Sequence, residues 1–276
     1  MTAALETRDL SVRFGGLKAV DGISVTVEDG RVLGVIGPNG AGKSTFINLI
    51  TGQIRPTRGK VLVAGRDLTG AKPWKIAAAR VARTFQINKP FRGLSVRDNV
   101  AIGAMFGAPG GGSVAKARGV ADEVLERLGL SGVAELGPTE LSVAHAQRLE
   151  VAKALALRPR VLFLDEAMAG LRPAEMEPQL ELIRELRREG LAIVVVEHVM
   201  RAIRSVCDTV LVMQEGRELL TGPPDEVLAD ERVITAYLGQ RYAERQRAER
   251  AEAGGGGPAV ADQVGPRPEG ETRAPG

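Results

Sequence analysis

A glycine-rich loop at residues 37–45 constrains this chain more than any other feature. It reads Gly-Pro-Asn-Gly-Ala-Gly-Lys-Ser-Thr and fits the phosphate-binding pattern G-x-x-x-x-G-K-S/T. The apolar residues 32–36 come directly before it and have strand length, so the loop lies between a strand and a helix, as the pattern requires. A chance glycine-rich turn is therefore disfavoured. The residues expected to surround bound phosphates are Gly37, Pro38, Asn39, Gly40, Ala41, Gly42, Lys43, Ser44 and Thr45.

The residue types in this loop suit a nucleoside triphosphate with its metal ion. Glycines let backbone N–H groups turn inward around anionic oxygens, and the helix that starts there aims the positive end of its dipole at them. Lys43 can reach the β- and γ-phosphates, and the hydroxyl of Ser44 can ligate Mg²⁺.

Two carboxylates form the second strong signal. The apolar run 161–164 ends in Asp165 and Glu166, which places both at the carboxyl end of a buried strand, where ligands bind in open α/β sheets. We expect Asp165 to face Mg²⁺ through a water molecule and Glu166 to orient or deprotonate an attacking water. Two solvated acids at a strand end are a common alternative, but the phosphate loop upstream favours the functional interpretation.

Periodicity and β-branched residues predict the remaining elements. Strands are expected at residues 5–14, 22–27, 61–63, 81–85 and 193–196, with a hairpin at 210–213 and 218–220. Helices are expected at 45–52, at 174–189, from the N-cap Ser142 to residue 157, and over most of 96–131 around a glycine-rich break at 108–113. The expected inward faces carry Val120, Val124, Leu125 and Leu128 in one helix, and Met176, Leu180, Ile183 and Leu186 in another. Strands that alternate with helices indicate an α/β fold with a mostly parallel sheet.

The composition limits the cellular setting. With 276 residues, of which 44% are hydrophobic, the chain can form one or two domains. The single cysteine excludes an internal disulfide framework and suits a reducing cytosol. The longest aliphatic run, 191–196, is only strand-length and the N-terminus lacks a secretion signal, so work at a membrane would need another subunit. A net charge of +3 is too small to argue for nucleic acid as a partner.

The C-terminal residues 241–276 differ in composition from the rest. They are rich in Arg, Glu, Gly and Pro and have almost no large apolar side chains, so burial cannot offset the entropy of ordering them. We expect a folded domain at 1–240 and a disordered tail at 241–276.

Several short motifs occur in a fixed order along residues 5–240. They are Phe14-Gly15-Gly16, the phosphate loop, the Arg-Thr-Phe-Gln run at 83–86, Leu141-Ser142, Leu164-Asp165-Glu166, Ala169-Gly170-Leu171, Glu197-His198 and the run at 233–239. With these motifs the chain resembles the nucleotide-binding subunit of ATP-binding cassette (ABC) transporters, and more narrowly the ATPases of branched-chain amino acid importers.

The resemblance implies a P-loop NTPase cassette with a mostly parallel sheet core, an antiparallel β subdomain and an inserted helical subdomain at about 88–141. That subdomain would dock the coupling helices of a permease. Phe14 would stack on adenine, although a buried strand Phe is the alternative. Gln86 would contact Mg²⁺ and sense the γ-phosphate, and His198 would act as a switch near the γ-phosphate. Without the resemblance, the alternatives are an ordinary surface glutamine at 86 and a structural, hydrogen-bonding histidine at 198. Ser142 would bind the γ-phosphate of a partner's nucleotide in trans.

Four positions depart from the family pattern. The signature reads Leu-Ser-Val-Ala-His at 141–145, so Ala144 adds a Cβ where a glycine usually admits the phosphate, and His145 replaces a glutamine. Ala167 replaces the usual proline after the glutamate. Arg172 stands where Asn or Asp usually touches the partner's phosphate loop, which puts that contact in doubt.

The resemblance further implies that ATP and Mg²⁺ are the cofactors of an ATP-hydrolysing subunit at the cytoplasmic face of the membrane. Its partners would be a second ABC ATPase subunit in a heterodimer, a permease and, indirectly, an extracytoplasmic solute-binding protein; nucleic acid is not expected. Amides, urea or aromatic acids are alternative solutes. A soluble ABC ATPase acting on ribosomes or DNA, and a regulator without turnover, are alternatives from other classes.

Overall fold

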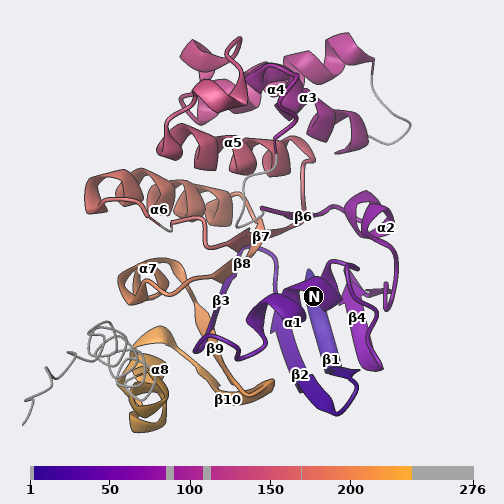
Figure 1. Ribbon diagram of the computed structural model, residues 1–276, viewed down its shortest axis with the longest axis vertical. Helices are drawn as coiled ribbons and strands as arrows, with labels where there is room; N and C mark the ends of the chain where they lie inside the picture. Colours follow the sequence, from indigo (N-terminus) through magenta and orange to yellow (C-terminus); the bar gives the residue numbers. More distant parts are fainter. Residues whose placement is uncertain (1–2, 85–89, 108–112, 169, 238–276) are drawn as a thin grey trace, which may run out of the picture. The chain divides into compact units, whose positions relative to one another are not determined.

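The computed structural model describes residues 3–84, 90–107, 113–168 and 170–237 (Figure 1). They belong to one compact unit that ends at Tyr237. Gln86 and the tail at 241–276 lie outside the described residues, so the predictions for them stay untested.

A six-stranded sheet carries the phosphate loop. Its strand order is β10-β9-β3-β8-β7-β6, and every neighbouring pair is parallel except β9 and β10, which form an antiparallel hairpin. The strands are β3 (Val32–Ile36), β6 (Val81–Arg83), β7 (Val161–Asp165), β8 (Ala192–Val196), β9 (Thr209–Gln214) and β10 (Arg217–Gly222). The mostly parallel sheet predicted from the sequence is confirmed, and β3, β7 and β8 are buried along their whole length, as helices on both faces of a sheet require.

The strands of this sheet supply two separate cores because side chains alternate between its faces. Val32 and Ile36 of β3 pack with the helices on one face, whereas Leu33 and Val35 pack toward α1 (Lys43–Ile50) and a second sheet. The loop at the end of β3 is thus anchored on both sides.

The second sheet is antiparallel, with the order β2-β1-β4-β5. Its strands are β1 (Leu5–Phe14), β2 (Leu17–Val27), β4 (Arg58–Val63) and β5 (Arg66–Asp67). The prediction that the second strand begins at residue 22 was wrong by five residues, since Leu17 already pairs with Phe14 across a two-residue turn. Gly15 in that turn has a φ of 58°, which glycine adopts without strain.

Helices α3, α4 and α5 pack on one another beside the parallel sheet, in the upper part of Figure 1. The helices that follow α1 along the chain are α2 (Pro73–Ala78), α3 (Val96–Gly107), α4 (Val114–Arg127), α5 (Val143–Ala156), α6 (Pro173–Arg188), α7 (Met200–Val206) and α8 (Pro224–Ala229). Short 3₁₀ turns lie at Ser131–Val133 and Pro138–Glu140. The face of α4 differs from the prediction, because Ala117 and Ala121 are buried beside Leu125 while Val120 and Val124 are only half-buried. The predicted inward face of α6 is confirmed at Leu180, Ile183 and Leu186, which are buried.

Candidate nucleotide site

Both ends of the phosphate loop adopt backbone conformations that only glycine tolerates there. Gly37 and Gly42 have φ values of 149° and 100°. A Cβ on Gly37 would collide with the carbonyl oxygen of Met213 in β9, and one on Gly42 with the carbonyl oxygen of Ala19 in β2. The pattern glycines are therefore required by the closeness of two strands as well as by the turn itself.

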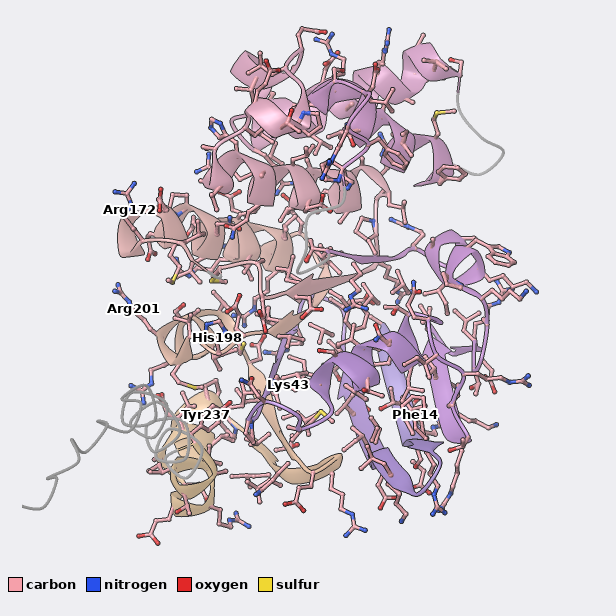
Figure 2. The ribbon with its side chains drawn as sticks, viewed as in Figure 1. Phe14, Lys43, Arg172, His198, Arg201 and Tyr237 are labelled. Atoms are coloured by element: carbon pink, nitrogen blue, oxygen red, sulfur yellow. The ribbon has the colours of Figure 1, made fainter. Side chains whose placement is uncertain are left out.

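Lys43 begins α1 (Figure 2), and its side chain folds back over the phosphate loop. Its Nζ donates hydrogen bonds to the carbonyl oxygens of Gly37 at 2.6 Å and Pro38 at 3.1 Å. Burial lowers the pKa of Lys43, while the negative charges of Glu166 and Asp165 raise it. The structure thus brings this lysine close to both predicted carboxylates, and the next residue in the chain, Ser44, is exposed.

Asp165 lies in a buried polar network at the end of β7. Its Oδ2 accepts a hydrogen bond from Nη2 of Arg83 at 2.6 Å, and its backbone N–H donates to Oγ1 of Thr84 at 3.1 Å. Nη1 of Arg83 also donates to Oδ1 of Asn48 in α1, at 2.5 Å. The side chains of Asp165 and Arg83 are only 6% and 12% exposed. Arg83 was not predicted as a site residue. The signal available in the sequence was an arginine that follows the apolar Val81 and Ala82 in one short strand, because a charged side chain at such a position needs a partner.

Glu166 occupies a strained turn that follows β7. Its φ is 50°, in the left-handed region, and its N–H donates to the carbonyl oxygen of Val196 at 2.9 Å. Two residues later, the N–H of Met168 donates to Oε1 of Glu197 at 2.9 Å. The turn is thereby tied to the end of β8, and the exposed His198 follows directly. Glu197 interacts electrostatically with both His198 and Glu166, so the predicted base and switch lie in one region.

Phe14 lies where β1 turns into β2 and is 51% exposed (Figure 2). The alternative of a buried strand phenylalanine is therefore wrong for this residue. Its exposed ring leaves stacking on adenine as a prediction that the described structure permits.

Ser142 caps α5 as predicted, and its Oγ accepts a hydrogen bond from the N–H of His145 at 3.2 Å. Within the part of the chain that the structure describes, no hydrogen bond joins this serine to the phosphate loop of the same chain. Ala144 lies in the first turn of that helix. Arg172, which replaces the usual Asn or Asp, is exposed and pairs with Glu175 at 3.3 Å at the start of α6.

A residue near the C-terminus of the unit also reaches the phosphate loop, and the sequence did not reveal it as a site residue. The hydroxyl of Tyr237 accepts a hydrogen bond from the N–H of Gly37 at 2.6 Å. Burial raises the pKa of this tyrosine to about 12. In addition, the N–H of Gly216, between β9 and β10, donates to the carbonyl oxygen of Ala41 at 2.9 Å. The C-terminal part of the unit therefore braces the loop from outside.

Comparison with known proteins agrees with this arrangement. A family profile described as ABC transporter matches residues 20–169, more than half of the chain. The chain belongs to the ABC transporter ATP-binding family. A second profile, described as branched-chain amino acid ATP-binding cassette transporter, matches residues 217–243 of this ABC ATPase.

Relatives match the cassette over most of its length. It is 35% identical over 249 residues to the high-affinity branched-chain amino acid transport ATP-binding protein BraF of Pseudomonas aeruginosa, covering 86% of this chain and 98% of the relative. It is also 35% identical to LivG of Escherichia coli, with the same coverage. The probable LivG of Archaeoglobus fulgidus is 32% identical, covering 87% and 97%. Membership of this family makes the chain an ATPase subunit.

Solved cassettes share the fold. The crystal structure of a nucleotide-free ATP-binding cassette from an ABC transporter aligns with a TM-score of 0.77 at 30% identity, covering 86% of this cassette and 99% of that chain. The ADP conformation of MJ1267, an ATP-binding cassette of an ABC transporter, gives the same TM-score at 29% identity, covering 87% and 100%. Among the described residues, no helix has both the length and the apolar character needed to cross a membrane.

Proposed function

We propose that this ABC ATPase powers the import of branched-chain, hydrophobic amino acids through a separate permease, from the cytoplasmic face of the membrane. The observation that carries the proposal is the match of residues 217–243 to the profile of branched-chain amino acid cassettes. That segment includes Tyr237, whose hydroxyl accepts the hydrogen bond from Gly37, so the described part of this segment also reaches the phosphate loop. The transport proteins BraF and LivG, aligned over 98% of their length, support the same solute class.

ATP would bind across the phosphate loop. Residues 37–45 would surround the phosphates, and Lys43, whose ammonium already lies against two loop carbonyls, would contact the β- and γ-phosphates. The exposed ring of Phe14 would stack on adenine. The bracing contact of Tyr237 keeps the first loop residue in place.

The polar residues beside Lys43 fit Mg²⁺. Among the described residues there is no cluster of three or more His, Cys, Asp or Glu that could cage a metal ion. Mg²⁺ bound with a nucleotide suits such a site, because it keeps several waters and takes one or two protein ligands plus phosphate oxygens. Ser44 would ligate it directly, Gln86 would contribute a further contact, and Asp165 would act through water, since Arg83 holds its Oδ2. The bound ion would neutralise charge on the phosphates.

Turnover would depend on Glu166 and His198. Glu166 would accept a proton from a water whose oxygen bonds to the γ-phosphorus while the bond to the bridging oxygen breaks, which leaves ADP and phosphate. His198, exposed at the end of β8, would contact the γ-phosphate. Ser142 would complete the nucleotide site of a second ATPase subunit in a heterodimer, and the exposed Arg172 would lie at the same interface.

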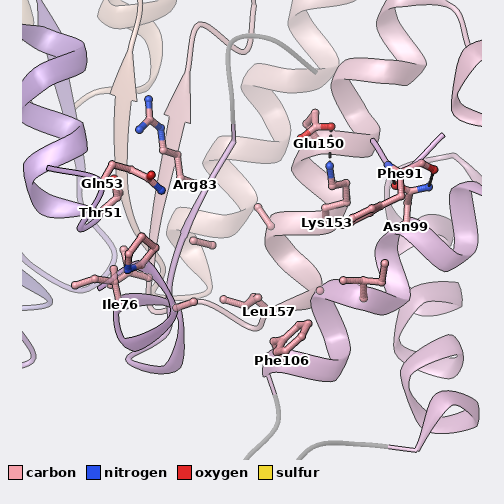
Figure 3. A pocket seen from close by; sticks show the side chains of 17 residues that line it. Thr51, Gln53, Ile76, Arg83, Phe91, Asn99, Phe106, Glu150, Lys153 and Leu157 are labelled. Atoms are coloured by element: carbon pink, nitrogen blue, oxygen red, sulfur yellow. Dashed lines mark hydrogen bonds and ion pairs between the residues drawn. The ribbon is translucent and has the colours of Figure 1, made fainter. Parts of the chain in front are cut away.

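A groove between α2, β6, α3 and α5 would receive a helix of the permease (Figure 3). It holds about 280 Å³, and the exposed aromatic rings of Phe91 and Phe106 line it. Arg83 lines the same groove while pairing with Asp165, so an occupant would touch a residue of the nucleotide site directly. Exposed aromatic rings beside an apolar groove favour a helix with large apolar side chains as the occupant.

The test is uptake by liposomes that contain the permease, this chain and its partner ATPase, with a solute-binding protein outside and MgATP inside. We expect uptake of leucine, isoleucine and valine and none of urea, a short amide or an aromatic acid. Uptake of one of the latter instead would overturn the solute class. Phosphate release that no permease stimulates would favour the soluble ATPase, and no release in any assembly would favour the regulator.

A further inference from the structure

Glu197 is a fully buried carboxyl group beside the residues assigned to turnover. It directly follows the buried strand β8, which ends at Val196, and is 1% exposed. Its Oε1 accepts the hydrogen bond from the N–H of Met168, whereas Oε2 has no hydrogen-bond partner among the described residues. A buried carboxyl with an orphan oxygen is costly for folding, so its presence at this position needs an explanation.

The contact of Glu197 falls on the turn that carries Glu166. A left-handed conformation is unfavourable for a residue with a side chain, and it persists only when its surroundings hold it. Among the described residues, two hydrogen bonds join this turn to the segment that ends β8. One joins the N–H of Glu166 to the carbonyl oxygen of Val196, and the other joins the N–H of Met168 to Oε1 of Glu197. The second is the only one of the two that a side-chain substitution can remove.

We propose that Glu197 is a positioning residue for Glu166, since its buried carboxyl holds the turn at residues 166–168 in the strained conformation that presents Glu166 to the nucleotide. The inference rests on the proposed role of Glu166 as the base. Loss of Glu197 should let the turn relax, so that Glu166 loses its placement. A misplacement of about 1 Å can cost on the order of a hundredfold in rate.

Burial and nearby groups shift the pKa of the Glu197 carboxyl in opposite directions. Burial raises its pKa, and the nearby Glu166 raises it further, while the N–H of Met168 and the charge of His198 lower it.

The test compares two substitutions in the assembled transporter. Glu197→Leu keeps the bulk but offers no acceptor, whereas Glu197→Gln keeps a carbonyl oxygen for Met168. We expect Glu197→Leu to lower kcat on the order of tenfold to a hundredfold with the Kd for MgATP within about twofold of wild type. Glu197→Gln should stay within about threefold of wild type in kcat. If Glu197→Leu fails to fold, Glu197→Asp, which withdraws the carboxyl by one methylene, takes its place. It should likewise lower kcat while leaving the Kd for MgATP near that of wild type.

Thr7→Val is the matched control for the loss of a buried polar contact. Thr7 is also 1% exposed, donates to the carbonyl oxygen of Ile23 at 3.2 Å and accepts from the N–H of Val25 at 3.0 Å, far along the chain from the turn. It should lose stability but keep kcat. An unchanged kcat in Glu197→Leu, a loss shared equally by Thr7→Val, or a loss confined to ATP binding would overturn the inference.

Glu166→Gln separates this inference from the proposed function. If Glu166→Gln keeps turnover, the role of the base is wrong. If Glu166→Gln abolishes turnover while Glu197→Leu does not lower it, only the positioning role is wrong. In the Glu166→Gln background, adding Glu197→Leu should cause no further loss, because both changes remove the same contribution.

Discussion

Tyr237→Phe removes one hydroxyl group and keeps the ring, so it isolates the hydrogen bond that braces the phosphate loop. The N–H of Gly37 is buried and would lose its 2.6 Å acceptor. Leaving a buried donor unsatisfied costs about 1–3 kcal/mol. For a unit of this size, each kcal/mol shifts Tm by about 2–4 °C, so we expect a fall of about 2–12 °C.

The same substitution should weaken nucleotide binding. If the bond contributes about 0.5–1.5 kcal/mol to holding the loop in its binding conformation, the Kd for MgATP should rise about twofold to twelvefold. Calorimetric unfolding and equilibrium binding of MgATP to the full chain measure the two effects. Tyr242→Phe, the same chemical change in the tail predicted to be disordered, is the control. A Tyr237→Phe protein with the Tm and Kd of wild type would refute the bracing role.

Three further predictions concern the rest of the chain. Arg83→Met should leave the buried Asp165 carboxylate without this ion-pair partner and lower the free energy of unfolding by about 3–5 kcal/mol, which is a fall in Tm of about 6–20 °C. Arg58→Met, which removes an exposed ion pair with Asp9, should lower it by only about 0–1 kcal/mol. Equal falls in Tm for the two variants would contradict this prediction. Truncation after Gln240 should leave Tm and phosphate release unchanged, and a large loss of either would show that the tail stabilises the unit. Burial raises the pKa of the Cys207 thiol to about 12, so at pH 8 only about one part in ten thousand of it is thiolate. A disulfide reagent should therefore label Cys207 slowly until urea unfolds the chain, and rapid labelling of the native protein would contradict the burial.

The local parts of the site could be predicted from the sequence. The phosphate loop needs a strand before it, glycines at its ends and a helix after it, and all three lie within about twenty neighbouring residues. Asp165 and Glu166 follow an apolar run that could only be a buried strand. Ser142 is a favourable N-cap, and the structure confirms that cap.

The contacts that hold the site together could not be predicted in the same way. The bonds from Arg83 to Asp165, from Met168 to Glu197 and from Gly37 to Tyr237 join residues 82, 29 and 200 positions apart, so no local pattern records them. Helices α2, α7 and α8 have only 6, 7 and 6 residues, too few turns to show a periodic apolar face. The early start of β2 was missed because Gly15 and Gly16 form a tight turn, whereas the sequence prediction used them only as part of a family motif.

Leucine uptake driven by Glu166→Gln tests most directly the claim that ATP hydrolysis at this chain powers transport. The substitution keeps the shape of the side chain and removes the base. In liposomes with the permease and the partner ATPase, MgATP should bind with the wild-type Kd, while phosphate release from this site and leucine uptake should fall together by orders of magnitude. Lys43→Ala serves as the control for lost nucleotide binding, because it should raise the Kd as well. Wild-type uptake by Glu166→Gln would contradict the account.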